Sequence, residues 1–223
     1  MQHKARLRVF AQPLLLLLSI VAPALFAAAP ETQGTFPGAD PVINRPYQNP
    51  DYERWVQVFE RPGREVFDRR QDIVRHLGLK TGMTVADIGA GTGLFTRLFA
   101  AQVGPEGRVI AVDISEEFTR NILRTARDQG LDNVEVVVNT QQSTGLDLGS
   151  IDLVFICDTY HHFEYPEAMM SSVYQALRPG GEVIIVDFRR RAGVNSPWIM
   201  DHVREGKEGV VQEMAQAGFR LIE

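Results

Sequence analysis

The chain has 223 residues, which is enough for one well-buried domain and short for two. It carries 23 basic and 28 acidic residues, a formal net charge of −5 at pH 7, and 44% of its residues are hydrophobic, as in an ordinary globular protein. The acidic balance excludes nucleic acid and an anionic membrane surface as expected partners.

Residues 1–29 have the pattern of a secretory signal peptide. Three basic residues precede an apolar run over 9–26, and three alanines follow where a signal peptidase would cut. We therefore predict an exported, periplasmic protein, whose mature chain would keep 20 basic and 28 acidic residues, a net charge of −8. The alternative is an uncleaved anchor over 9–29, which is long enough to cross a bilayer and would make the membrane a partner. Pro13 and Pro23 weaken that alternative.

Two segments lie between the N-terminus and the first predicted strand. Residues 30–50 contain five prolines and two glycines, which predicts an extended linker with little packing. Residues 51–77 are expected to form a helical cap on a domain over 51–223, with an amphipathic helix over 64–77 that ends at Gly78. Three aromatic residues of the cap could line an acceptor pocket: Tyr52, Trp55 and Phe59.

From residue 83 onward, apolar strand patterns alternate with helical ones. The strands are short and β-branched enough to be buried on both faces, which predicts a mainly parallel, doubly wound, Rossmann-like sheet with helices on both faces. The single cysteine, Cys157, falls in one of these strands and is expected to be a buried, inert thiol. The predicted strands are 83–89, 108–114, 134–139, 151–158, 181–188 and 219–222, and the predicted helices are 93–102, 115–130, 166–177 and 209–217.

A glycine-rich turn follows the first of these strands. Residues 85–93 read Val-Ala-Asp-Ile-Gly-Ala-Gly-Thr-Gly, in which glycine permits both a tight turn and the close approach of backbone N–H groups to a ligand. Ligands in such sheets bind at the carboxyl ends of the strands, where Asp87, Asp113 and Asp158 are expected. The pattern predicts a nucleotide-like cofactor.

A nicotinamide dinucleotide is the alternative ligand for such a turn. Its fingerprint, G-x-G-x-x-G, would need a glycine at position 94, where this chain has Leu94. A nicotinamide-dependent oxidoreductase is therefore the less favoured interpretation.

The glycine turn resembles motif I of the class I S-adenosylmethionine-dependent methyltransferases. The resemblance extends over about residues 78–190, through Asp113, the stretch Ile-Asp-Leu-Val-Phe-Ile-Cys-Asp-Thr-Tyr-His-His-Phe over 151–163, and Leu-Arg-Pro-Gly-Gly over 177–181. It implies S-adenosylmethionine as cofactor and methyl transfer to a small-molecule acceptor. A noncatalytic protein that binds an adenosyl ligand on the same scaffold is the alternative.

The resemblance also implies roles for individual residues. The methionine part of the cofactor would lie against Gly89, Ala90, Gly91 and Gly93. Asp87 would hold its ammonium group and Asp113 its ribose hydroxyls. Many relatives contact adenine with an Asp-Ala pair, and the matching residues here are Thr140 and Gln141, so the Gln141 amide is the expected adenine contact.

Family members normally end with an antiparallel strand inserted between the fifth and sixth strands of the sheet. The sequence stops at Glu223 without a segment for it. We expect that strand to be lacking, with either a truncated chain or the strand over 181–188 as an effective edge.

Methyl transfer from a sulfonium is an in-line displacement that requires mainly alignment and exclusion of water. A general base is needed only if the acceptor must lose a proton. His161 and His162 are the candidates for that base or for substrate contact, and Asp158 is expected to orient the cofactor or its loop. The sequence predicts no metal site and specifies neither the acceptor atom nor the oligomeric state.

Overall fold

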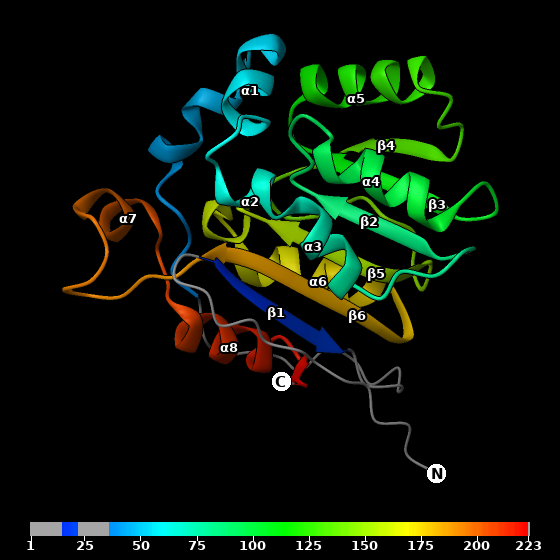
Figure 1. Ribbon diagram of the computed structural model, residues 1–223. Coiled ribbons are helices and arrows are strands. Elements are labelled where there is room, and N and C mark those ends of the chain that lie inside the picture. Colours follow the sequence, from blue (N-terminus) through cyan, green and yellow to red (C-terminus); the bar gives the residue numbers. More distant parts are fainter. Residues whose placement is uncertain (1–14, 22–35, 223) are drawn as a thin grey trace.

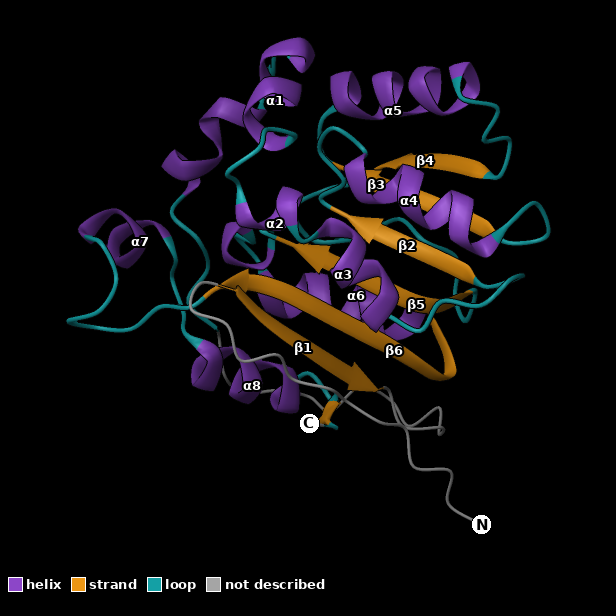
Figure 2. Cartoon of the chain, in the orientation of Figure 1, coloured by secondary structure: helices purple, strands orange, loops and turns teal. Residues whose placement is uncertain are grey.

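The computed structural model describes residues 15–21 and 36–222, which form an α/β fold around one seven-stranded sheet (Figures 1 and 2). The strand order is β4-β3-β2-β5-β6-β1-β7. The strands are β1 (Leu15–Val21), β2 (Thr84–Ile88), β3 (Arg108–Asp113), β4 (Val134–Val138), β5 (Ile151–Cys157), β6 (Leu177–Phe188) and β7 (Arg220–Leu221).

Five neighbouring strands, β4, β3, β2, β5 and β6, pair in parallel, which confirms the predicted fold class. Every residue of β2 is buried, as expected for a central strand covered on both faces. Figure 1 shows the arrowheads of β2, β5 and β6 pointing toward the side of the molecule where α2 and α7 lie, so this side carries the carboxyl ends of the parallel strands.

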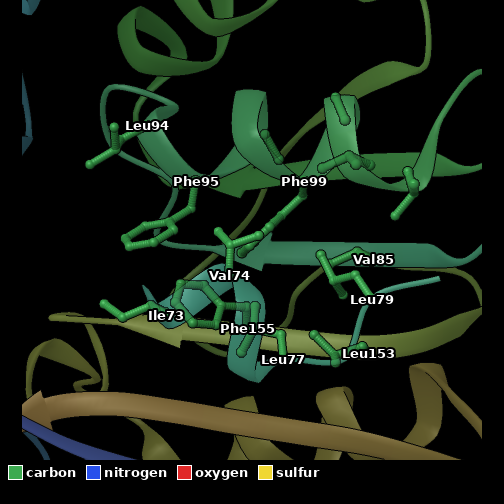
Figure 3. Close-up of a cluster of buried hydrophobic side chains, with 14 of the residues drawn as sticks. Ile73, Val74, Leu77, Leu79, Val85, Leu94, Phe95, Phe99, Leu153 and Phe155 are labelled. Atoms are coloured by element: carbon green, nitrogen blue, oxygen red, sulfur yellow. The ribbon is translucent and has the colours of Figure 1, made fainter. Parts of the chain in front are cut away.

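Helices cover both faces of the sheet. One core cluster lies under α3, α4 and α5, and the other under α6 and α8. In the first cluster, Phe95 and Phe99 of α4 pack against Phe155 of β5, with ring centroids 4.8 and 5.1 Å from that of Phe155 (Figure 3). The helices are η1 (Pro41–Tyr47), α1 (Tyr52–Phe59), α2 (Glu65–Asp68), α3 (Arg70–His76), α4 (Leu94–Val103), α5 (Glu116–Asp128), η2 (Tyr160–His162), α6 (Pro166–Ala176), α7 (Pro197–His202) and α8 (Lys207–Gln216).

The antiparallel strand expected to be missing is supplied by the N-terminus. Strand β1 pairs antiparallel with β6 from Leu15 opposite Phe188 to Val21 opposite Glu182, and with β7 on its other side. The expectation that residues 181–188 form an open edge is therefore wrong. A leucine-rich run of strand length can satisfy the hydrogen-bonding groups of β6 without any segment beyond β7.

The remainder of the expected signal peptide, residues 1–14 and 22–29, lies outside the described residues, so the signal peptide stays a prediction. Within 15–21 and 36–222, no helix is both long enough and apolar enough for a bilayer crossing.

The region before β2 differs from expectation in two ways. In the expected linker, residues 41–47 form η1. Ala39 is buried, and its N–H donates to the Phe163 carbonyl. The described part of 30–50 therefore packs against the domain, while residues 30–35 are not described. The expected helix over 64–77 is divided into α2 and α3 at Arg69, whose ψ of 3° interrupts the helical run.

Candidate functional site

A cavity of about 770 Å³ lies at the carboxyl ends of the parallel strands, within the range typical of small-molecule pockets. Its lining includes the glycine turn, Asp113, and several aromatic and histidine side chains. Nine of the ten site residues predicted from the sequence line it: Asp87, Gly89, Ala90, Gly91, Asp113, Gln141, Asp158, His161 and His162. The tenth, Gly93, precedes α4 and is not among the lining residues.

The glycine turn needs glycine for two separate reasons. Gly89 and Gly91 have φ angles of 69° and 56°, the left-handed region that disfavours other residues. A Cβ atom on Gly89 would also lie 2.2 Å from the Thr159 Cγ2 atom, so β2 and the loop after β5 approach too closely for any side chain there. The turn thus presents its backbone to the cavity.

Asp87 is buried at the end of β2, and the Thr96 hydroxyl donates a 2.6 Å hydrogen bond to its Oδ2 atom. Burial raises the pKa of Asp87 to about 7, against the opposing effect of the Thr96 hydrogen bond. A carboxyl with this pKa favours a cationic partner, since a positive charge would stabilise its ionised form.

Asp113 fixes the glycine turn. Its Oδ2 atom accepts the Gly91 N–H at 2.8 Å, and its Oδ1 atom accepts the Ser115 N–H at 2.9 Å. Burial raises the pKa of Asp113 to about 6, and these backbone hydrogen bonds limit the rise. Each carboxylate oxygen has a second lone pair, so the same side chain can accept hydrogen bonds from a ligand in the cavity.

Asp158 has a φ of 48° and forms an ion pair with Arg64, with 2.5 Å between Arg64 Nη2 and Asp158 Oδ2. Burial raises the pKa of Asp158, while the Arg64 charge lowers it. Asp158 therefore ties the cap to the end of β5. The amide of Gln141, the expected adenine contact, donates to Glu164 Oε1 at 2.9 Å, and Gln141 lines the cavity.

The two candidate histidines have different environments. His161 is buried, and its Nδ1 atom lies 2.7 Å from Asp187 Oδ1. Burial acts to lower the pKa of His161, but the Asp187 carboxylate outweighs it and raises the pKa above its ordinary value. Burial and the neighbouring His161 and His202 lower the pKa of His162 to about 3, so His162 is neutral at physiological pH.

The cap contributes side chains to the lining of the cavity. Trp55 and Phe59 line it as expected, whereas Tyr52 is buried beside it with its hydroxyl 3.2 Å from the Thr92 carbonyl oxygen. Cys157 is only half-buried and lines the cavity, in contrast to the expected fully buried thiol. Burial raises its pKa well above the ordinary value, so the thiol stays protonated.

Sequence reasoning missed four residues that complete this site. Asn44 comes from the expected linker, Arg64 from the cap, Asp187 from the end of β6 and His202 from α7. Asp187 follows the same rule as Asp87 and Asp113, a carboxylate at the end of a parallel strand, so the sequence carried a signal for it. For Asn44 and His202 no local pattern distinguishes them from ordinary surface residues.

Comparison with known proteins identifies the domain. Residues 85–181 match the family model of a methyltransferase domain. The ubiquinone/menaquinone biosynthesis C-methyltransferase UbiE of Hydrogenovibrio crunogenus is 28% identical over 114 residues, which are 51% of this chain and 45% of that protein. UbiE of Pseudomonas savastanoi is 32% identical over 118 residues, 51% of this chain and 44% of that protein. The aligned part of the chain thus spans less than half the length of these relatives.

Solved structures show the same fold. A SAM-dependent methyltransferase from Aquifex aeolicus superposes with a TM-score of 0.66 at 26% identity, covering 77% of this chain and 90% of that one. Phosphoethanolamine N-methyltransferase 2 of Haemonchus contortus, in complex with S-adenosylhomocysteine, superposes with a TM-score of 0.60 at 20% identity, covering 76% of this chain and 44% of that one, and shows the fold alone. Together with the match over 85–181, these relationships confirm the resemblance noted in the sequence: residues 85–181 form a methyltransferase domain of the class I S-adenosylmethionine-dependent type.

Proposed function

We propose that the protein transfers the methyl group of S-adenosylmethionine to a small-molecule acceptor that carries an aromatic ring. The observation that carries this proposal is that one cavity joins the glycine turn and Asp113 to an aromatic wall. A donor and an acceptor held in the same cavity can meet in the in-line geometry that methyl transfer requires.

The donor half of the cavity fits S-adenosylmethionine. Asp87 would face the ammonium group, Asp113 the ribose hydroxyls, and Gln141 the adenine edge. The turn at Gly89 and Gly91 would offer its backbone to the methionine part, and the Phe59 ring lies close to it at Gly91. When bound, the cofactor supplies an activated methyl group on a sulfonium, so the protein itself needs to align the acceptor and exclude water.

The acceptor half is aromatic. Tyr47, Trp55 and Phe59 form a continuous stack, with centroid distances of 4.8 Å from Tyr47 to Trp55 and 4.8 Å from Trp55 to Phe59. Phe188 and Trp198 line the same cavity. Such surfaces favour a flat, unsaturated ring. The relatives named as ubiquinone/menaquinone C-methyltransferases support an aromatic or quinol-like acceptor.

His161 is the candidate general base of this chain. Its Nδ1 atom is held by Asp187, which leaves the Nε2 atom for an acceptor proton, in the way that a carboxylate orients a catalytic histidine. His162 borders the same part of the cavity and is a candidate substrate contact.

Calorimetric titration of the full chain tests the donor assignment. We expect binding of S-adenosylmethionine and S-adenosylhomocysteine but not of NAD. Asp113→Ala should weaken adenosyl binding by about 1–3 kcal/mol, because a buried hydrogen-bond acceptor is lost. The matched control is Asp132→Ala, an exposed aspartate on the loop before β4, which should bind like the wild type. Binding of NAD alone would overturn the proposal, and binding without turnover of any aromatic acceptor would favour a noncatalytic adenosyl-binding protein.

We also propose export to the periplasm, on the basis of the basic start, apolar run and alanine exit of residues 1–29. Cell fractionation combined with the mass of the recovered chain tests it. A cytoplasmic protein of full mass would contradict export, and a full-length protein in the membrane fraction would favour the anchor over 9–29.

A further inference from the structure

Three histidines from two separate parts of the chain converge beside the cavity. His161 and His162 form the end of η2, and His202 ends α7. One ring nitrogen from each lies within 4.8 Å of the other two, and all three residues line the cavity. The ring centroids are 4.3 Å apart between His161 and His162, 5.1 Å between His161 and His202, and 5.2 Å between His162 and His202.

Two of the rings are oriented by hydrogen bonds at their Nδ1 atoms. His161 Nδ1 lies 2.7 Å from Asp187 Oδ1, and His162 Nδ1 lies 2.8 Å from Asn44 Oδ1. In both cases an oxygen acceptor fixes the tautomer with the proton on Nδ1, so Nε2 carries a lone pair. This is the arrangement by which carboxylates and amides orient histidine ligands of metals.

Two further hydrogen bonds orient the side chain of Asn44. Its Nδ2 atom donates to the His162 backbone carbonyl at 3.0 Å and to Glu164 Oε1 at 2.8 Å, which determines that its Oδ1 atom faces the imidazole. The third ring is placed by stacking, since His202 lies on Trp198 with a centroid distance of 4.6 Å and an interplanar angle of 17°.

Residues next to His161 and His202 in the chain take part in a buried polar network. Arg204, two residues after His202, makes a two-pronged ion pair with Glu213, at 2.6 and 2.7 Å. Glu213 in turn accepts a 2.7 Å hydrogen bond from the hydroxyl of Tyr160, the residue before His161. This network joins α8, η2 and the segment that follows α7.

The charges around the cluster favour the same conclusion. The nearby Asp187 and Asp158 carboxylates supply negative charge that would balance a cation.

We propose that His161, His162 and His202 form a binding site for a divalent transition metal, with Zn²⁺ as the best match, and that its open coordination position faces the acceptor half of the cavity. Three imidazoles with a remaining open position are typical of a catalytic rather than a structural zinc site. The sequence predicted no metal because His202 lies 40 residues beyond His162, without the short ligand spacing of known zinc motifs.

The geometry requires one adjustment. Zn–N bonds of about 2.0–2.1 Å in a tetrahedron place the nitrogens about 3.4 Å apart. The largest separation here, 4.8 Å, must therefore shorten by roughly 1.4 Å. His202 is half-buried at the end of a six-residue helix, and rotation of its side chain supplies a movement of this size.

The role of the metal rests on the proposed methyl transfer. With the metal bound, His161 Nε2 would be a ligand and could not act as the general base. A hydroxyl or thiol of the acceptor would instead occupy the open position and release its proton to solvent, because a bound cation lowers the pKa of such a group. The acceptor class is thereby narrowed to ring compounds with a metal-binding oxygen or sulfur. Transfer then forms the bond between the acceptor and the methyl carbon, breaks the bond between that carbon and the sulfonium, and leaves S-adenosylhomocysteine.

Metal binding is measured directly on the purified, chelator-treated full chain by titration with Zn²⁺ and by the visible absorption of Co²⁺. We expect one equivalent per chain and a Co²⁺ spectrum of tetrahedral intensity. His162→Ala and His202→Ala should each weaken Zn²⁺ binding by at least tenfold, and Asn44→Ala by about tenfold as the loss of an orienting partner. His161 is left intact because its removal would leave the buried Asp187 without its partner.

His76→Ala is the matched control, since His76 lies on α3 outside the cluster, and it should bind Zn²⁺ like the wild type. Circular dichroism establishes that each variant is folded. Absence of micromolar Zn²⁺ binding by the folded wild type, or binding that persists in both His162→Ala and His202→Ala, would overturn the metal site. Zn²⁺ binding without S-adenosylmethionine binding would instead leave the site standing and reject the proposed methyl transfer, so the two failures are distinguishable.

Discussion

Arg64 reaches across the cavity to Asp158, 94 residues later in the chain, and pairs with its carboxylate at 2.5 Å. The pair holds the cap against the end of β5. Arg64→Ala would leave a largely buried carboxylate without its counter-charge, and we expect the free energy of unfolding to fall by about 1–3 kcal/mol. Urea denaturation measures this change.

The control for Arg64 is Arg75→Ala. Arg75 also pairs with an aspartate, Asp72, but its side chain is 68% exposed, so its loss should change stability by less than about 1 kcal/mol. Equal effects of the two substitutions would show that the Arg64 pair does not hold the cap.

Cofactor binding should depend on pH through Asp87. Its pKa is raised to about 7 in the free protein, so below this value the carboxyl must lose a proton before it can pair with the cofactor ammonium. Affinity for S-adenosylhomocysteine should therefore increase about tenfold from about pH 5.5 to about pH 7, a range in which the ligand ammonium stays protonated. Calorimetry in buffers of different ionisation enthalpy measures the released proton.

Two comparisons isolate this effect. Asp87→Asn cannot titrate, so its affinity should be weaker and nearly independent of pH. Adenosine lacks the ammonium group, so the pH dependence of its affinity should come only from Asp113, whose pKa is about 6. A wild-type affinity that does not change over this pH range would remove Asp87 from the ammonium site.

Gly89 and Gly78 share a left-handed backbone, with φ angles of 69° and 65°, but differ in their surroundings. In Gly78→Ala the new Cβ atom would meet no atom within 4 Å. The free energy of unfolding should therefore fall only by the cost of the left-handed backbone, about 1–2 kcal/mol. In Gly89→Ala the new Cβ atom would also collide with the Thr159 side chain, so the free energy of unfolding should fall by about 1–3 kcal/mol more. Equal losses in thermal or urea unfolding would refute the close approach of β2 and the loop after β5.

Glu213 and Glu135 each form a two-pronged ion pair with an arginine, but only the Glu213 pair is buried. Glu213→Gln should destabilise the protein by about 3–5 kcal/mol, because Arg204 is left as a buried cation. Glu135→Gln, whose partner Arg108 is half exposed, should change stability by less than about 1 kcal/mol. Chemical denaturation of both variants checks the difference.

The sheet and the placement of the glycine turn beside the cavity could be predicted because their signals are local. Strands β2 and β3 are mostly apolar and carry Asp87 and Asp113 at or next to their last position, and the glycine turn has its own spacing. The acceptor half depends on contacts between distant segments. Asn44 and His162 are 118 residues apart and meet only because η1 packs against η2, which no periodicity within either segment reveals.

The N-terminus shows a different limit. Residues 15–21 have the composition expected of a signal peptide core and also that of a buried strand, since both require an unbroken apolar run of this length. Sequence patterning alone cannot separate these two uses, because the partner strand β6 lies more than 150 residues away.

The pairing of β1 with β6 makes maturation and sheet completion mutually exclusive for a single molecule. Cleavage after residue 29 would carry away all seven residues that face 182–188, deprive β7 of its hydrogen-bonded neighbour and uncover an apolar strand in the middle of the sheet. Among the described strands, none would then pair with β6 on that side, and such an unpaired apolar edge favours pairing with another strand.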